Sequence, residues 1–271
     1  MSKIYISADL EGVNGVVYPH QTEPTNEGYK YAQKQQHKEL NCLIEALINA
    51  GVEHITLNDA HGSMDNLTLS ELNSKIELIT GKPKPVSMLT GLDESYDCVF
   101  FTGYHARAGS EKGVLAHTFS TIYKNVKLND VSVGEIELNA VYAGIKKVPV
   151  ALITGDYAAC EQAKESLKTV NTVCVKKAIS TTAAICRPED DLIQDLSEKA
   201  SQIMKNLESL ELYSQNAPYK LELDFVDRKM ADIAELLPCL KRISDTAIIY
   251  ESDNYEEVYK LLQFLTATLS K

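Results

Sequence analysis

The sequence of 271 residues lacks the features that place a protein in or across a membrane. Its first residues, MSKIYISADLEG, contain no apolar segment followed by the small-residue cleavage site of a signal peptide. No apolar run approaches the roughly 18 residues that a membrane span requires. Basic residues are outnumbered, and the formal net charge of −11 argues against binding to nucleic acid or to an anionic membrane surface. We therefore expect a cytoplasmic protein that has neither of these partners.

The six cysteines include no CxxC pair, and most of them lie within apolar segments such as DCVFF and NTVCV. Buried, reduced thiols explain this distribution better than a disulfide framework or a thiolate metal site. Three catalytic signatures are missing as well: the GxSxG elbow of serine hydrolases, the GxxxxGK[ST] phosphate loop and the HExxH helix of zincins. The stretch EGVNGV resembles a glycine-rich phosphate loop only weakly, and its acid would repel a phosphate.

Strand-like and helix-like segments alternate along the chain, in a composition of 44% hydrophobic and 24% charged residues that is ordinary for a globular protein. The pattern predicts strands near residues 3–9, 54–59, 97–103, 148–155, 219–226 and 246–252, a hairpin at 122–134, and helices near 26–50, 188–207, 230–238 and 254–270. Such alternation is typical of an α/β fold with a mostly parallel open sheet that helices cover on both faces. A mild break near residue 187 predicts a larger catalytic lobe (1–187) and a smaller C-terminal αβ lobe (188–271), unless both belong to one continuous domain.

The most informative polar residues follow three of the predicted strands. Asp9 and Glu11 end the first strand, His61 follows the second within NDAHG, and His105 follows the third within GYHARA. In an open α/β sheet, ligands bind outside the carboxyl ends of the strands, so these side chains should converge on one edge. Side chains two residues apart in extended backbone point to the same side, and the two carboxylates would repel each other unless a cation lies between them.

Other polar residues in or near these motifs have simpler explanations. Asp59 in NDAHG fits a helix cap or a turn better than a metal ligand. Arg107 in GYHARA would either bind a substrate carboxylate or form a surface or interface ion pair, and the sequence favours neither. The remaining histidines, His20, His37 and His54, have no such context and are expected at the surface.

Helical periodicity adds a third carboxylate. In VGEIELNAVYAGI the apolar stripe runs back from Leu138 to Glu135, whereas Glu137 lies roughly 200° around the helix from Glu135 and is expected to be solvated. A carboxylate on a buried stripe must be paired or coordinate a metal, and a structural salt bridge is the alternative for Glu135. His117 lies in the mostly apolar stretch KGVLAHTFS, where it is either an ordinary core histidine or, near a metal, a general base or proton shuttle.

One candidate metal site therefore collects three carboxylates and two imidazoles: Asp9, Glu11, His61, His105 and Glu135. This mixture of ligands suits Zn²⁺, Mn²⁺ or Co²⁺, and Zn²⁺ is the usual choice for hydrolysis. Five protein ligands exceed what one catalytic zinc takes, whereas a carboxylate that bridges two ions about 3.5–4 Å apart accommodates all of them. Such ions activate water and polarise a carbonyl, so the expected reaction is hydrolysis of an amide or ester.

These motifs resemble the D-aminopeptidase family, dinuclear zinc metallopeptidases of bacteria and archaea. SADLEG fits the SxDxEG signature of that family, and NDAHG, GYHARA, GVLAHTF and VGEIELNA are similar to its other motifs, in the same order and with similar spacing. The similarity continues through ITGDYAACEQA and KKAISTTAA, so it covers the first two-thirds of the chain well and the rest loosely. Together the motifs are highly specific, whereas SxDxEG alone is moderately so.

The resemblance implies a role for each candidate ligand. Asp9 bridges two zinc ions. Glu11 and His61 hold one of these ions, and His105 and Glu135 hold the other. All the ligand positions of the family are therefore occupied in this sequence.

The resemblance also implies that His117 is the catalytic histidine and that the enzyme removes N-terminal D-amino acids, notably D-Ala, from short peptides. Its subunits form a decamer of two stacked pentameric rings around an internal channel. The sequence departs from the family pattern beside the site, where Ala116 and Thr118 flank His117 and where Ala60 and Gly62 lie in NDAHG. These departures bear on substrate preference rather than on metal binding.

The sequence therefore predicts a dinuclear zinc aminopeptidase that acts on short peptides through metal-activated water and assembles into a homo-oligomer. Two alternatives stay open. One is a metallohydrolase of other specificity, an L-dipeptidase or an amidase, that uses the same ions. The other is a non-catalytic, metal-stabilised oligomeric binding protein.

Overall fold

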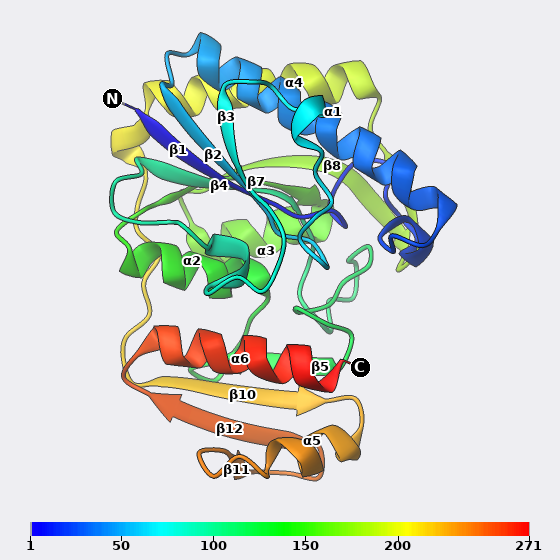
Figure 1. Cartoon of the computed structure of the whole chain (residues 1–271), viewed down its shortest axis with the longest axis vertical. Helices are drawn as coiled ribbons and strands as arrows, with labels where there is room; N and C mark the ends of the chain where they lie inside the picture. Colours follow the sequence, from blue (N-terminus) through cyan, green and yellow to red (C-terminus); the bar gives the residue numbers. More distant parts are fainter. Residues whose placement is uncertain (1, 271) are drawn as a thin grey trace.

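The computed structural model describes residues 2–270, which are arranged around two β-sheets (Figure 1). The larger sheet has the order β3-β2-β1-β4-β7-β8-β9 and is parallel except for β9, which pairs antiparallel with β8. Its strands are β1 (Lys3–Ala8), β2 (His54–Asp59), β3 (Ile76–Ile79), β4 (Cys98–Tyr104), β7 (Val150–Asp156), β8 (Asn171–Ser180) and β9 (Ala183–Cys186). The predicted α/β fold with a mostly parallel open sheet is confirmed.

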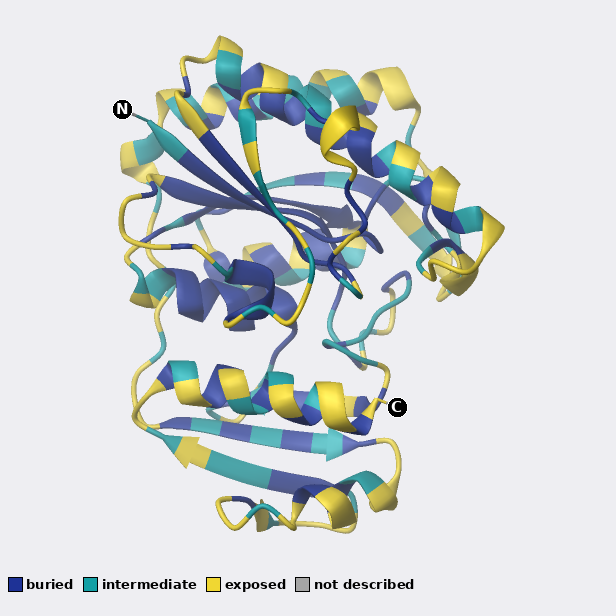
Figure 2. Ribbon diagram, viewed as in Figure 1, coloured by how far each residue is buried: buried dark blue, intermediate teal, exposed yellow. Residues whose placement is uncertain are grey.

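Four helices cover the two faces of this sheet, one pair on each face (Figure 1). They are α1 (Glu27–Asn49) with α4 (Glu189–Lys205), and α2 (Glu135–Ile145) with α3 (Tyr157–Leu167). Strand β1 shows why both faces need cover: Ile4 and Ile6 pack with α1, whereas Tyr5 points into the core on the other face. The exposed residues therefore gather on the outer sides of the helices (Figure 2). Among residues 2–270, no helix combines the length and the hydropathy needed to cross a membrane.

The smaller sheet is antiparallel and has the order β11-β12-β10-β5-β6, with α6 lying between it and the larger sheet (Figure 1). Its elements are β5 (Tyr123–Leu128), β6 (Val131–Ser132), β10 (Tyr219–Phe225), β11 (Lys241–Arg242), β12 (Ala247–Ser252), α5 (Arg228–Ala234) and α6 (Tyr255–Leu269). The predicted hairpin at 122–134 is present, and Asn129 and Asp130 at its tip both have positive φ.

The two sheets interleave along the chain. Strands β5 and β6 precede residue 187 yet belong to the smaller sheet, whereas α4 follows it and packs against α1 on the larger sheet. One core, built around Tyr5, Ile136 and Tyr259, runs from the larger sheet through α2 and α6 to the smaller sheet. A division of the protein into folding units at residue 187 stays a prediction.

Two expectations about exposure were wrong. His37, expected at the surface, is buried on α1, where its Nε2 accepts a hydrogen bond of 2.9 Å from the backbone N–H of Thr68. Glu137, expected in solvent, is buried at the start of α2 and accepts hydrogen bonds from the Gly134 N–H (2.8 Å) and from Gln162 (2.8 Å). Both helices are therefore buried on more than the one side that their apolar stripes indicate.

The predictions for the other histidines and for the cysteines were confirmed in part. His20 and His54 are exposed, as predicted. All six cysteines are free thiols, but the expected burial holds for Cys98 and Cys160 alone. Cys42 and Cys174 are half-buried, and Cys186 and Cys239 are exposed.

Candidate metal centre

The strand order explains why the three strand-end motifs meet. In the larger sheet β1 lies between β2 and β4, and the chain order reverses there, because β2 and β3 extend to one side and β4 and β7 to the other. Open α/β sheets bind ligands at such a switch point. Asp9 therefore follows the central strand, with His61 after β2 on one side and His105 after β4 on the other.

Asp9 faces both histidines through different oxygens. Its Oδ1 lies 3.4 Å from His61 Nδ1, and its Oδ2 lies 3.4 Å from His105 Nε2. Glu11 Oε2 lies 2.9 Å from the same His61 nitrogen, and Glu135 Oε1 lies 3.4 Å from the same His105 nitrogen. The structure thus brings all five predicted ligands into one buried cluster of two halves, with Asp9 shared between them.

Each histidine at the site has its second ring nitrogen tied to a backbone carbonyl. The pairs are His61 Nε2 with Thr22 (2.9 Å), His105 Nδ1 with Ala106 (3.1 Å) and His117 Nδ1 with Leu115 (2.8 Å). A carbonyl oxygen only accepts hydrogen bonds, so in the neutral imidazole that nitrogen carries the proton. The other nitrogen then presents a lone pair to the carboxylates, the orientation that metal-ligating histidines commonly have.

Three atoms of the cluster are buried without a hydrogen-bond partner among residues 2–270: Asp9 Oδ2, Glu11 Oε2 and His105 Nε2. All three are acceptors when the carboxyls are ionised and the imidazole is neutral, so their lone pairs face one another. Buried polar atoms are rarely left unpaired in native proteins. Oxygen and nitrogen lone pairs that converge in this way fit a divalent cation of the zinc type.

The electrostatics of the cluster agree with a cation. Burial and the neighbouring Glu11 raise the pKa of Asp9 to about 7. Burial lowers the pKa of His105, but Glu135 and Asp9 oppose that effect and raise it to about 10. Protons therefore occupy the cluster at neutral pH unless a metal ion replaces them, and metal binding should release protons.

His117 lies at the more exposed edge of the cluster, in the connection between β4 and β5. Its ring stacks on that of His105 with centroids 4.0 Å apart, and its Nε2 lies 4.0 Å from Glu135 Oε1. Burial and the adjacent His105 lower the pKa of His117, which keeps its imidazole neutral and able to accept a proton. Leu115 and Phe119 on either side have positive φ values of 53° and 57°, so the backbone around His117 is strained.

Asp59 and Arg107 have no direct role in this cluster. The carboxylate of Asp59 accepts hydrogen bonds from the Asn66 side chain (2.7 Å) and the Leu67 N–H (2.8 Å), which organise the loop after β2. Arg107 donates from Nη1 to the Ala108 carbonyl (2.9 Å) and has no acidic partner within residues 2–270. Its binding to a substrate carboxylate, or to an acid of another subunit, stays a prediction.

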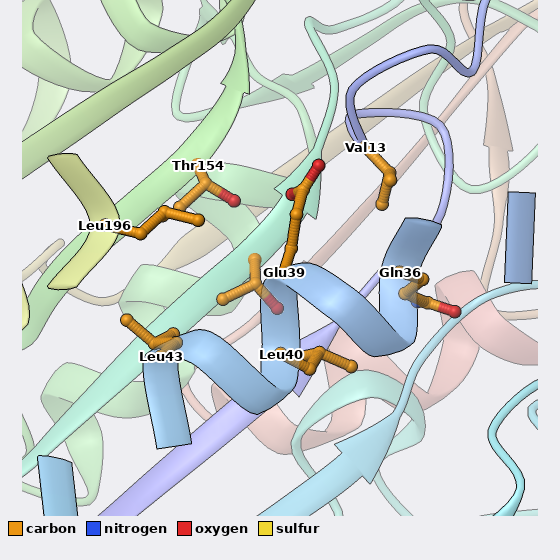
Figure 3. Close-up of a pocket in the computed structure, with 8 residues that line it drawn as sticks. Val13, Gln36, Glu39, Leu40, Leu43, Thr154 and Leu196 are labelled. Carbon is orange, nitrogen blue, oxygen red and sulfur yellow. The ribbon is translucent and has the colours of Figure 1, made fainter. Parts of the chain in front are cut away.

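Sequence reasoning missed the residues that hold the turn after β1. Gln36 on α1 donates from Nε2 to the Asp9 carbonyl (2.8 Å), and Glu39 accepts a hydrogen bond from the Asn14 N–H (2.8 Å). Both side chains line a small pocket beneath the turn, together with apolar residues of α1 such as Leu43 (Figure 3). They are polar residues on the buried stripe of a helix, which is the same signal that identified Glu135.

We expect Glu39→Gln to stabilise the metal-free protein at high pH. Burial raises the pKa of Glu39 from 4.5 to about 7, so the folded state loses this proton at a higher pH than the unfolded state does. The resulting penalty is absent below the unfolded pKa of 4.5, grows as the pH rises from there to about 7, and stays constant at higher pH. The free energy of unfolding, measured with urea, should rise by up to ~3 kcal/mol at pH 8 and change little at pH 4.5. Glu45→Gln, at an exposed position of α1, is the control, and an equal effect at both pH values would contradict the prediction.

Gly12 allows the turn to pass against β4. Its N–H donates to the Gly103 carbonyl (2.7 Å), and a Cβ at this position would lie 2.0 Å from the Tyr104 carbonyl oxygen. We expect Gly12→Ala to lower the free energy of unfolding by ~1–3 kcal/mol and to reduce metal binding, because backbone atoms cannot move aside. Urea unfolding and metal analysis would measure both. Gly81→Ala is the control: it strains a backbone of positive φ but its Cβ meets no neighbouring atom, so it should lower the free energy of unfolding and leave metal binding unchanged. Normal metal content in Gly12→Ala would contradict the expected loss of metal binding.

A sheet edge that presents carboxylates and imidazoles with converging lone pairs is typical of a metal-dependent hydrolase. Comparison with known proteins identifies the family. The model of the D-aminopeptidase family (Peptidase_M55) matches residues 2–264. A D-aminopeptidase of Bacillus subtilis (strain 168) is 31% identical over 265 residues, which are 97% of this chain and 96% of the relative.

A solved structure agrees with this match. It is described as the Zn-dependent D-aminopeptidase DppA from Bacillus subtilis, a self-compartmentalizing protease, and it superposes with a TM-score of 0.94 at 30% identity, over 98% of this chain and 97% of that one. The chain belongs to the D-aminopeptidase family, and the predicted family is confirmed. It is therefore an enzyme of the peptidase class, a hydrolase that acts on peptide bonds.

Proposed function

We propose that the protein is a dinuclear zinc aminopeptidase that removes the N-terminal residue, a D-amino acid such as D-Ala, from short peptides. The observation that carries this proposal is the position of Asp9, whose two oxygens face the two halves of the cluster. Asp9 would bridge two ions, with Glu11 and His61 on one of them and His105 and Glu135 on the other. The similarity to a protein described as a Zn-dependent D-aminopeptidase supports both the metal and the substrate class.

Zinc in such a site supplies a Lewis acid that activates water and polarises the scissile carbonyl. His117 is positioned to move the protons, because its Nε2 faces the cluster while its Nδ1–H is held by the Leu115 carbonyl. It would accept a proton from the attacking water and deliver it to the leaving amine. The burial of Asp9 and Glu135 keeps their charges poorly screened, which would strengthen their attraction for the metal ions.

A substrate panel tests this function. The protein is purified without chelators and supplied with D-Ala-D-Ala, L-Ala-L-Ala and a simple amide, and we expect the D-dipeptide to be cleaved fastest. Dialysis against a chelator should abolish the activity, and added Zn²⁺ should restore it. Faster cleavage of the L-dipeptide or of the amide would identify the L-dipeptidase or amidase alternative. A protein without zinc that gains no activity from Zn²⁺, Mn²⁺ or Co²⁺ would be the non-catalytic binding protein.

The assembly and the cellular location belong to the same proposal. We propose a homo-oligomer, and the family resemblance favours a decamer of two pentameric rings. The description of the solved relative as self-compartmentalizing supports this, as do Ile179 and Ile185, which are 70% and 65% exposed on the outer β8–β9 pair. Light scattering should give about ten times the chain mass of 30.0 kDa, and a monomer would contradict it. A cytoplasmic location stays a prediction.

A further inference from the structure

Lys176, on β8, is a lysine whose side chain is almost completely enclosed, with 1% of its surface exposed. Its ammonium donates to the backbone carbonyls of Glu11 (2.5 Å), Val13 (2.7 Å) and Val16. An ammonium has three N–H donors, so all of them are used on this single turn. In the part of the chain that the structure describes, its hydrogen-bond acceptors are these backbone carbonyls and no carboxylate. The lysine therefore occupies the hollow of the turn as a bound cation would.

The turn is the segment 9–16 that follows β1 and carries Asp9 and Glu11. Three carbonyl oxygens that point toward one point repel each other, and the Lys176 ammonium removes that repulsion. Within residues 2–270 the Glu11 carbonyl has no other hydrogen-bond donor. The backbone at Glu11, and with it the direction of the Glu11 carboxylate toward His61, therefore depends on Lys176.

The other half of the centre is held by different contacts. The Asp9 N–H donates to the Thr102 carbonyl (2.8 Å) on β4, and the Asp9 carbonyl accepts the hydrogen bond from Gln36. His105 follows β4 and Glu135 begins α2, and the Lys176 ammonium donates a hydrogen bond to neither of them. Loss of the ammonium should therefore displace Glu11 more than Asp9 or the residues beyond it.

We propose that Lys176 is a positioning residue for the half of the metal centre formed by Glu11 and His61, an inference that rests on the proposed two-ion site. It touches neither metal nor substrate; it shapes the turn from which Glu11 reaches the site. Ligand-supporting residues of this kind commonly change metal affinity about 10–100-fold when they are replaced. Replacement of Lys176 should therefore weaken the binding of the ion held by Glu11 and His61 and leave the other ion unaffected.

The test is a zinc titration of the metal-free, full-length protein. Zinc binding is measured by calorimetry or by competition with a chromophoric chelator. Lys176→Met keeps most of the side-chain volume and removes the charge. Lys177→Met is the matched control, because Lys177 is the next residue on β8 but is exposed, with its Nζ 5.5 Å from the centre of the Tyr157 ring. We expect two zinc ions per chain in the wild type and in Lys177→Met. In Lys176→Met one ion should bind normally and the other at least about tenfold more weakly.

Circular dichroism of the metal-free variants separates a local effect from unfolding. Lys176→Ala provides a second test, including the case in which Lys176→Met does not fold, because it leaves space that propylammonium can enter. Recovery of the weakened zinc site with propylammonium, but not with sodium, supports the proposal. Wild-type affinity at both sites, equal weakening of both, or no recovery would overturn it. A wild type that binds fewer than two zinc ions would instead overturn the two-ion site itself.

Discussion

Replacing Asp9 with asparagine is expected to release both metal ions and to lower kcat/KM by more than about 10³-fold. Among residues 2–270, Asp9 is the acidic side chain that lies within 4 Å of both His61 and His105, at 3.4 Å from each. Asparagine keeps the shape but offers one neutral oxygen in place of two charged ones, so it cannot hold two cations together. Metal analysis of the purified variant, together with peptide hydrolysis at added Zn²⁺, would measure both losses.

Two further variants make this result specific. Glu11→Gln removes a ligand from one half only, so it should reduce the metal content by about one ion and leave the His105 half loaded. Asp253→Asn, at an exposed position before α6, should behave as the wild type. An Asp9→Asn protein that keeps two zinc ions and loses less than about tenfold in kcat/KM would show that Asp9 does not bridge them.

His117→Ala is expected to retain both metal ions and to lose about 10²–10⁴-fold in kcat, the usual contribution of a positioned acid or base. The imidazole stacks on His105 and lies 4.0 Å from Glu135, but its side chain is 18% exposed, more than that of any of the five predicted ligands. Its removal should therefore affect proton transfer more than metal binding. Steady-state kinetics beside zinc analysis would separate these two quantities.

His54→Ala is the matched control for this variant, because His54 is an exposed histidine at the start of β2. Loss of one zinc ion from His117→Ala would make His117 a ligand, a role that its proximity to His105 and Glu135 also permits. Unchanged kcat with unchanged metal content would remove His117 from the mechanism.

The sequence predicts the centre of the larger sheet well because β1, β2, β4 and β7 are apolar runs buried on both faces. It does not predict β3, which has only four residues and is partly exposed, or the pair β8 and β9, whose outer parts carry lysines in solvent. The sequence also does not predict that β5 belongs to the smaller sheet. Its partner β10 lies almost a hundred residues further on, and no local pattern encodes that pairing.

The same distinction applies to the site. Asp9, Glu11, His61 and His105 could be found because parallel neighbouring strands deliver their carboxyl ends to one edge. Glu137 was misplaced because α2 is buried over residues 135–143, between the larger sheet and α6, and a single apolar stripe indicates only one packing partner. The supporting residues behind the turn are polar and far apart in sequence, so only the fold brings them to it.

Anomalous scattering at the zinc absorption edge, from crystals grown without chelators, tests the central claim most directly. The account predicts two peaks per chain about 3.5–4 Å apart, one beside Glu11 and His61 and the other beside His105 and Glu135, with Asp9 between them. A single peak, or no peak at this cluster in active protein, would contradict it.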